Sequence, residues 1–229
     1  MIFYIQKSKS IPQKTVILMA EVVFLWISYW ILFLQGGDQL VNWNIIDFLS
    51  ASSVRKAIIL VFSMIVFLRT GFMLIYLLKR KIPWGEAISV VFGFVFYFIG
   101  FSILVLQSNK AIDWFDYLGI GLFLLGSVLN TVSELQRHFW KRHPENMGKL
   151  YTGGLFKYSM HINYFGDVLW VSAYAILTRN PYSILYPVLL FLFFAFYNIP
   201  LLDSYLKEKY GNDFDLYNKQ TKKFIPFIY

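Results

Sequence analysis

The sequence predicts an all-α integral membrane protein, a multi-pass bundle of about six membrane-spanning helices. Three observations support this fold class. Of the 229 residues, 58% are hydrophobic and only 15% are charged, whereas soluble domains average about 25% charged residues. The apolar residues gather in runs long enough to cross a bilayer, which takes about 20 residues as a helix. Basic residues are concentrated in alternate segments between these runs, which is typical of multi-pass proteins.

Six apolar runs are expected to form the spanning helices. They cover residues 15–35, 57–78, 87–107, 114–133, 164–178 and 183–202. The fifth run is short and begins inside a polar motif, so its start is the least defined boundary. The first run is too long for a secretory signal peptide and no small-residue cleavage site follows it, so we expect a retained helix.

Positive charge sets the expected orientation. Lysine and arginine are concentrated at the N-terminus, at residues 79–81, at residues 137–157 and in the C-terminal tail, while the other loops are nearly neutral. Because cytoplasmic loops carry the excess of Lys and Arg, both termini are predicted to be cytoplasmic. This bias and the attraction of anionic headgroups account for the net charge of +8. No nucleic-acid-binding motif is present, so nucleic acid is not an expected partner.

Several kinds of chemistry are excluded by the residue types that the sequence lacks. The absence of cysteine excludes disulfides, thiolate metal sites and thiol catalysis. The three histidines do not have the spacing of a zinc motif, so no metal site is expected. There is no phosphate-binding loop of the soluble nucleotide folds, and no internal repeat or long linker. Residues 1–229 are therefore expected to form a single integral membrane domain.

Two ionisable residues lie inside the predicted spans. Glu21 is in the first run and Arg69 is in the second. Ionisable residues at this depth usually face the bundle interior and mark a functional site. However, Glu21 is near the end of its run, and a long side chain such as Arg69 can extend to the interface or form a structural pair. Whether either residue lines a site is open at this point.

A polar motif precedes the fifth run. Residues 153–170 read GGLFKYSMHINYFGDVLW, and the segment before them, from Glu134 to Arg142, is rich in basic residues. Unpaired polar groups at the edge of a bilayer cost free energy, so such a density of them indicates a site rather than packing. Glu134 is expected to end the fourth helix. The arrangement fits a membrane enzyme that holds a charged cofactor against an apolar substrate.

The segment from Ser133 to Gly166 resembles the C-terminal domain of steroid 5α-reductases and the related DUF1295 family. These families share a superfamily with isoprenylcysteine carboxyl methyltransferases and sterol C14-reductases. Their common pattern is an acid at the end of a helix, a basic stretch, a Gly-Gly-Leu-Phe-x-Tyr element and an Asn-Tyr-Phe-Gly-Glu/Asp element. The tail also resembles the end that the superfamily shares. The resemblance covers roughly residues 110–229, whereas residues 1–109 match only in hydropathy and are expected to be a variable part.

The resemblance implies one of two reactions. Reductases of this superfamily pass a hydride from NADPH to the carbon–carbon double bond of an enone, while an acid polarises the carbonyl. The methyltransferases pass a methyl group from S-adenosylmethionine to a prenylcysteine carboxylate, a phospholipid amine or another lipid nucleophile. The glycine and Asn-Tyr-Phe-Gly elements, the spacing from Glu134 to Gly153 and the cations Lys141 and Arg142 favour a reductase, because cations bind phosphate strongly. His161 and the form of the tail favour a methyltransferase.

We therefore expect an NADPH-dependent reductase of an enone, steroid-like or other lipid substrate, with an S-adenosylmethionine-dependent methyltransferase as the alternative. The site is expected to face the cytoplasm, in a bacterial inner membrane or the endoplasmic reticulum. The resemblance implies that the cofactor-binding residues are Glu134, Lys141, Arg142, Gly153, Gly154, Asn163, Tyr164, Asp167 and Tyr217. The candidate catalytic residues are Tyr158, Glu21 and His161.

Simpler roles stay open for several of these residues. Gly153 and Gly154 can serve a tight turn, and Tyr158 and Tyr164 can be aromatic residues of the membrane interface. Asp167 is one methylene shorter than the usual glutamate of the family. Because Asn163 and Glu134 lie at opposite ends of one loop, we expect that loop to fold back and bring them together on the cofactor.

Overall fold

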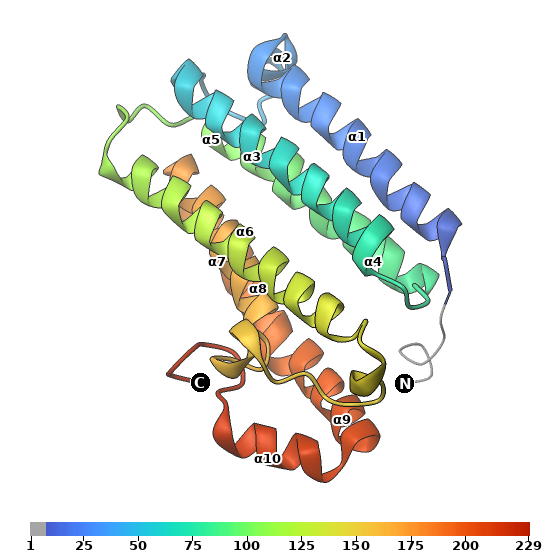
Figure 1. The fold of residues 1–229 in the computed structure, drawn as a ribbon. Helices are drawn as coiled ribbons and strands as arrows, with labels where there is room; N and C mark the ends of the chain where they lie inside the picture. Colours follow the sequence, from blue (N-terminus) through green and yellow to red (C-terminus); the bar gives the residue numbers. More distant parts are fainter. Residues whose placement is uncertain (1–7) are drawn as a thin grey trace. The chain divides into compact units, whose positions relative to one another are not determined.

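The computed structural model describes residues 8–229, which form helices and connecting loops without a strand (Figure 1). Five helical segments are long and apolar enough to cross a membrane, and they cover Ile11–Phe33, Ser53–Leu77, Trp84–Val105, Trp114–Trp140 and Pro181–Tyr210. The all-α, multi-pass fold class is thereby confirmed. The fifth expected span corresponds to helix α7 (Ile162–Thr178), whose 17 residues fall short of the ~20 that a bilayer requires.

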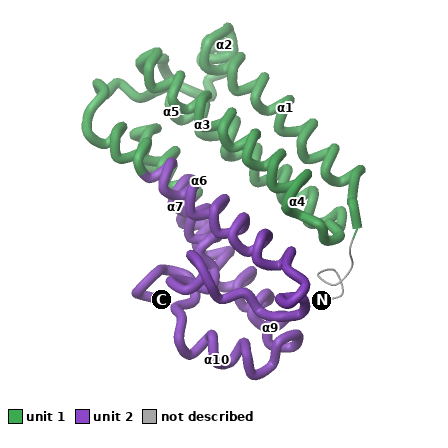
Figure 2. Tube along the Cα trace, in the orientation of Figure 1, with its two compact units in different colours: residues 1–121, 172–186 green, residues 122–171, 187–229 purple. Residues whose placement is uncertain are grey.

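The chain divides into two compact units, which are described separately (Figure 2). Unit 1 comprises residues 1–121 and 172–186, and unit 2 comprises residues 122–171 and 187–229. The expectation that residues 1–229 form one integral domain stays a prediction. In chain order, the elements of unit 1 before α6 are α1 (Ile11–Phe33), α2 (Gly36–Asn42), α3 (Ser53–Phe72), the π-helical segments η2 (Met73–Leu77) and η3 (Val95–Gly100) on either side of α4 (Trp84–Phe94), and α5 (Phe101–Val105).

Helix α1 packs against α3 and α4 in unit 1. A core of Ile17, Leu74, Ile82 and Ala87 lies at one end of these helices. Many apolar side chains on the same helices are exposed, and Ile75 is 73% exposed. Such an outer surface is stable only in an apolar solvent, because hydrocarbon accepts these side chains as readily as a core does.

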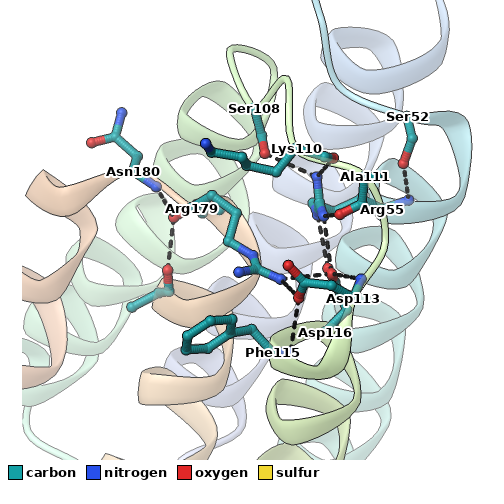
Figure 3. A network of polar contacts seen from close by, with 12 residues as sticks. Ser52, Arg55, Ser108, Lys110, Ala111, Asp113, Phe115, Asp116, Arg179 and Asn180 are labelled. Carbon is teal, nitrogen blue, oxygen red and sulfur yellow. Dashed lines mark hydrogen bonds and ion pairs between the residues drawn. The ribbon is translucent and has the colours of Figure 1, made fainter.

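A buried ionic network ties three segments of unit 1 together (Figure 3). The Arg55 guanidinium, at the start of α3, donates to both carboxylate oxygens of Asp116 at 2.8 and 2.9 Å. Arg179 donates to Asp116 at 2.8 Å and also pairs with Asp113. The hydrogen bond from Arg179 holds the pKa of the Asp113 carboxyl below its ordinary value. The network fixes the first turns of α3 and α6 (Trp114–Trp140) against the loop after α7.

Unit 2 contains the later part of α6 and the earlier part of α7. Its other elements are the 3₁₀ turns η4 (Pro144–Asn146) and η5 (Gly154–Lys157), most of α8 (Leu185–Phe193), the π-helical η7 (Phe194–Asn198), α9 (Ile199–Tyr210) and α10 (Asn212–Gln220), while the turn η6 (Pro181–Ile184) lies in unit 1. Within unit 2, α6 and α7 approach closely at Gly126 and Gly166. A Cβ atom at Gly166 would lie 2.6 Å from the carbonyl oxygen of Gly126. Glycine is therefore required for this helix crossing.

The expectation that Glu134 ends the fourth helix is wrong. Helix α6 continues to Trp140, and Arg137 pairs with Glu134 one turn later. An ion pair at i,i+3 spacing supports helix, so the charges that suggested a loop extend the helix beyond its apolar part. As a result, one side of α6 carries Glu134 and, one turn later, Arg137. Lys141, the first residue after the helix, follows on the same side about one further turn along.

Candidate functional site

The polar groups of unit 2 gather around the start of α7. Asn163 Nδ2 donates a hydrogen bond to Glu134 Oε1 at 3.0 Å, which confirms the expected convergence of these two residues. Glu134 is 9% exposed and its other carboxylate oxygen pairs with Arg137. One turn earlier on α6, Asn130 Nδ2 donates to the backbone carbonyl of Asn163 at 3.2 Å. A carboxylate and an amide are thus held side by side at the entrance to α7.

Asp167 lies one turn after Asn163 and is engaged by the protein itself. Its Oδ1 accepts hydrogen bonds from Asn130 Nδ2 at 2.9 Å and from Trp170 Nε1 at 2.8 Å. Asp167 therefore links α6 to α7 in unit 2, and any contact of its own with a cofactor stays a prediction. Asn130 was not expected from the sequence. The available signal was its place one turn before Glu134 in an otherwise apolar helix.

His161 is buried in a second polar group formed with α9 and the tail. It is 2% exposed, and its Nε2 lies 2.8 Å from Asp203 Oδ1. Lys223 Nζ lies 3.0 Å from the other oxygen of Asp203, and the His161 backbone N–H donates to the Lys223 carbonyl at 3.0 Å. The tail thereby returns to the polar motif. Asp203 was the detectable signal for this group, since it is an acid just after an apolar run.

Aromatic rings extend this group. The imidazole of His161 is parallel to the ring of Tyr164, with centroids 5.7 Å apart. The ring of Tyr164 also stacks on the ring of Phe194, with centroids 4.5 Å apart. Tyr164 thus lies in an aromatic stack within unit 2, with Phe224 packed edge-on against Phe194. Such rings offer an apolar surface beside the polar groups.

Cations surround the end of α6. Lys141 follows the helix, and Arg137 and Lys209 lie close enough to act on it electrostatically. Partial loss of hydration, together with these two neighbouring positive charges, lowers the pKa of Lys141 to about 8. In residues 8–229 no carboxylate lies within ion-pair distance of Lys141. Arg142, in the turn that follows, extends over the ring of Phe139.

The glycine pair and the two tyrosines lie around η5. Gly154 has a φ of +56°, and a Cβ atom there would clash with Gln136 and Tyr151, whereas Gly153 has a φ of −90° that any residue can adopt. Tyr217, on α10, donates its hydroxyl to the Phe156 carbonyl at 2.6 Å. Tyr217 therefore has a structural contact, and burial raises its pKa above the ordinary value. Tyr158 is 41% exposed.

Glu21 and Arg69 lie in unit 1, whereas every other expected site residue lies in unit 2. Glu21 is fully buried on α1, with the Thr70 side chain of α3 as its polar neighbour. The catalytic role expected for Glu21 stays a prediction. Among residues 8–229, no group of three or more acidic, histidine or cysteine side chains is arranged to hold a metal ion.

These features define a multi-pass membrane protein with a polar cluster at the start of α7. The family model of DUF1295, described as a protein of unknown function, matches residues 83–221. The chain therefore belongs to the DUF1295 family.

Curated proteins named for two different reactions are similar to this chain. A probable protein-S-isoprenylcysteine O-methyltransferase of Oryza sativa subsp. indica is 26% identical over 122 residues, which are 50% of this chain and 63% of the relative. A 3-oxo-5-alpha-steroid 4-dehydrogenase 2 of Sus scrofa is 30% identical over 157 residues, 63% of this chain and 59% of the relative. The chain thus spans about three fifths of the length of these curated relatives.

A solved structure of a eukaryotic intramembrane Ras methyltransferase, the isoprenylcysteine carboxyl methyltransferase, aligns with 96% of both chains at a TM-score of 0.47 and 17% identity. The family match and the two kinds of curated relative confirm the superfamily to which the sequence was assigned.

Proposed function

We propose that this protein is a membrane-embedded enzyme that uses NADPH to reduce the carbon–carbon double bond of an enone in a steroid-like or other lipid. The observation that carries the proposal is the cation group of Arg137, Lys141 and Lys209 next to the Glu134–Asn163 pair. Partial loss of hydration and the positive charges of Arg137 and Lys209 lower the pKa of Lys141, so the group brings an unfavourable repulsion to the fold. A bound polyanion would relieve that repulsion.

The charges of the two possible cofactors differ in sign. NADPH carries three phosphate groups, while S-adenosylmethionine carries a sulfonium cation and no phosphate. Lys141, which has no ion-pair partner in the described part of the chain, is suited to a phosphate through a charge-assisted hydrogen bond. The same cation would repel a sulfonium. The electrostatics of unit 2 therefore favour NADPH.

The other residues fit the polar and apolar parts of such a cofactor. Glu134 and Asn163 offer a carboxylate, an amide donor and an amide acceptor, the groups that hold ribose hydroxyls or a carboxamide. We propose that Lys141 and Arg142 bind phosphate and that Gly153 allows close backbone approach. When bound, NADPH would supply the hydride that reduces the double bond.

Negative charge develops on the carbonyl oxygen of an enone during reduction, and an acid must stabilise it. We propose the hydroxyl of Tyr158 for this role, because Tyr158 lies in the same polar motif as Asn163 and remains accessible. Glu21 is the second proposed acid. His161, held by Asp203 at 2.8 Å, is proposed to orient the stacked Tyr164 rather than to transfer a proton.

Methyl transfer from S-adenosylmethionine is the second proposed function. Two observations favour it: the similarity to isoprenylcysteine methyltransferases, and the buried histidine–aspartate contact at His161 and Asp203. A lipid nucleophile would be the acceptor in that case. Because S-adenosylmethionine carries a sulfonium cation, the carboxylates of unit 2 would attract it and the lysine and arginine side chains would not.

Cofactor binding by the purified full chain separates the two functions. We expect NADPH to raise the unfolding temperature and S-adenosylmethionine to leave it unchanged, because a ligand that binds only the native state adds RT ln(1 + [L]/Kd) to stability. Lys141→Gln should weaken NADPH binding, while the exposed control Lys149→Gln should not. Stabilisation by S-adenosylmethionine alone would establish the methyltransferase instead.

The site is proposed to face the cytoplasm because its surroundings hold most of the basic residues of unit 2. Reporters fused after residues 82 and 148 should then read as cytoplasmic, and a reporter after residue 110 should read as external. The opposite readings would contradict this orientation.

A further inference from the structure

A groove in unit 1 lies outside the site described above. It has a volume of about 750 Å³ and lies between the first residues of α1 and the last residues of η2. Three lysines and several aliphatic side chains line it. We propose that the groove binds an anionic phospholipid, with the phosphate on the lysines and an acyl chain on the aliphatic side chains.

The lysines make one part of the groove strongly cationic. They are Lys9, Lys14 and Lys79, and no carboxylate is among its described lining residues. Lys14 Nζ donates to the Leu78 carbonyl oxygen at 2.7 Å, so this ammonium is held between the two segments. An ammonium has three donors, which leaves donors of Lys14 available to a phosphate.

Neighbouring charges do not cancel this cationic character. The nearest acid after η2 in sequence is Glu86, and its carboxylate is engaged by both terminal nitrogens of Arg80 at 2.5 and 2.7 Å. That bidentate pair is internally neutral. The charge of the three groove lysines is therefore available to an external anion.

Backbone contacts fix the walls of the groove. The Ser8 N–H donates to the Lys79 carbonyl at 3.3 Å, and the Ile82 N–H donates to Ser10 Oγ at 2.9 Å. The residues before α1 and the residues after η2 are thus joined. A groove whose walls are already joined needs little ordering when a ligand binds.

The remaining lining residues are aliphatic. Leu18 lies one turn after Lys14 on the same side of α1, and Ile75 on η2 is 73% exposed. The lysines alone would suffice for free phosphate, and the aliphatic side chains alone would suffice for a neutral lipid. Their presence in one groove matches a molecule that has an anionic head and a hydrocarbon chain.

The position in the membrane agrees with this ligand. The groove lies at the start of the span Ile11–Phe33 and at the end of the span Ser53–Leu77. The ends of spanning helices lie at the level of the lipid headgroups. Lysines at that level attract anionic headgroups, and their aliphatic stems remain compatible with the hydrocarbon below.

The test uses the full chain in phosphatidylcholine nanodiscs, with phosphatidylglycerol of the same acyl chains added and bound lipid counted by native mass spectrometry. We expect selective retention of phosphatidylglycerol. The triple variant Lys9→Gln/Lys14→Gln/Lys79→Gln should weaken that retention by about tenfold or more. The charge-matched control Lys110→Gln/Lys149→Gln/Lys219→Gln should retain it.

A second arm separates the lipid from its headgroup. Ile75→Ser changes an exposed side chain and should weaken phosphatidylglycerol retention, while glycerol phosphate and inorganic phosphate should compete poorly with the intact lipid. Equal retention of phosphatidylcholine, unchanged retention in the groove triple variant, or competition by inorganic phosphate at the lipid's own concentration would each overturn the proposal.

Discussion

Arg55 in unit 1 and Asn163 in unit 2 both hold polar groups among membrane-spanning helices, but their surroundings differ. A guanidinium has five N–H donors, and the Arg55 side chain makes five hydrogen bonds, to Asp116, to Ser108 and to two backbone carbonyls (Figure 3). Around Asn163, by contrast, the nearby cation Lys141 has no ion-pair partner in the described part of the chain.

This contrast distinguishes structural polar groups from binding groups in a membrane protein. Every donor of Arg55 is satisfied by the protein, so a ligand would have to displace an existing bond. Near Asn163, partial loss of hydration and repulsion by the neighbouring positive charges of Arg137 and Lys209 lower the pKa of Lys141. A fold keeps such repulsion more readily where a ligand compensates it.

The first prediction concerns the Arg55 network, in which every guanidinium donor has a partner. Arg55→Met removes the main partner of Asp116, which is 1% exposed, and leaves a buried carboxylate that is contacted by Arg179 and by the Asp113 backbone N–H. Loss of one partner of a buried pair costs about 3–5 kcal/mol. We expect a large fall in the free energy of unfolding, measured by denaturation of the purified protein in detergent. Lys56→Met, one residue later, is the control and should have little effect, so equal effects of both variants would contradict the structural role.

The regions also differ in what the sequence could predict. The spans were predictable because hydropathy depends only on neighbouring residues. The Arg55–Asp116 pair was not predictable, since its members are 61 residues apart. In the sequence, Arg55 looks like an ordinary charged residue of a loop. The end of α6 was predicted too early for a related reason. Charged residues can continue a helix beyond the membrane, and hydropathy does not detect this.

In the candidate site, the sequence predicted the meeting of Glu134 and Asn163 but not the contacts of His161. Both members of the first pair belong to one recognisable motif. The partners of His161, Asp203 and Lys223, come from α9 and the tail, and only the return of the chain brings them to the motif. Asp203 alone was visible, as an acid next to an apolar run.

The second prediction concerns the polar groups around Asn163 in unit 2. Asn163→Ala should raise the Kd for NADPH about tenfold or more, because it removes a polar contact and leaves Arg137 as the partner of the Glu134 carboxylate. The free energy of unfolding should fall by only about 1 kcal/mol, far less than in Arg55→Met. Isothermal titration and denaturation measure the two quantities, and Asn218→Ala is the exposed control. A stability loss as large as that of Arg55→Met, with unchanged NADPH affinity, would make Asn163 structural.

The third prediction separates the two glycines. Gly154→Ala forces a left-handed backbone conformation on alanine and a clash with Gln136, so the free energy of unfolding should fall by about 1–2 kcal/mol. Gly153→Ala has no such strain and should change stability by much less. If the cofactor approaches the Gly153 backbone as proposed, Gly153→Ala will weaken NADPH binding while the protein stays folded. Wild-type affinity in Gly153→Ala would assign the glycine pair to the turn alone.

The last prediction concerns pH and has the smallest expected effect. The pKa of Lys141 is lowered to about 8, so in the unliganded protein the charged form is disfavoured. Between that value and the ordinary pKa near 10.5, the unfolded chain binds more protons than the folded one. The contribution of Lys141 to stability therefore rises with pH across this window. A phosphate beside Lys141 acts in the opposite direction, since it favours the protonated ammonium.

NADPH affinity should consequently fall as the pH rises from 7 to 9, by about threefold to fivefold if Lys141 is one of several phosphate contacts. Lys141→Arg keeps its positive charge throughout this range, so its Kd for NADPH should change much less with pH. Titrations of both proteins at constant ionic strength measure the difference, because salt screens the same interaction. A parallel pH dependence in wild type and Lys141→Arg would show that another group titrates, and would remove Lys141 from the proposed phosphate contacts while leaving the Glu134–Asn163 pair in place.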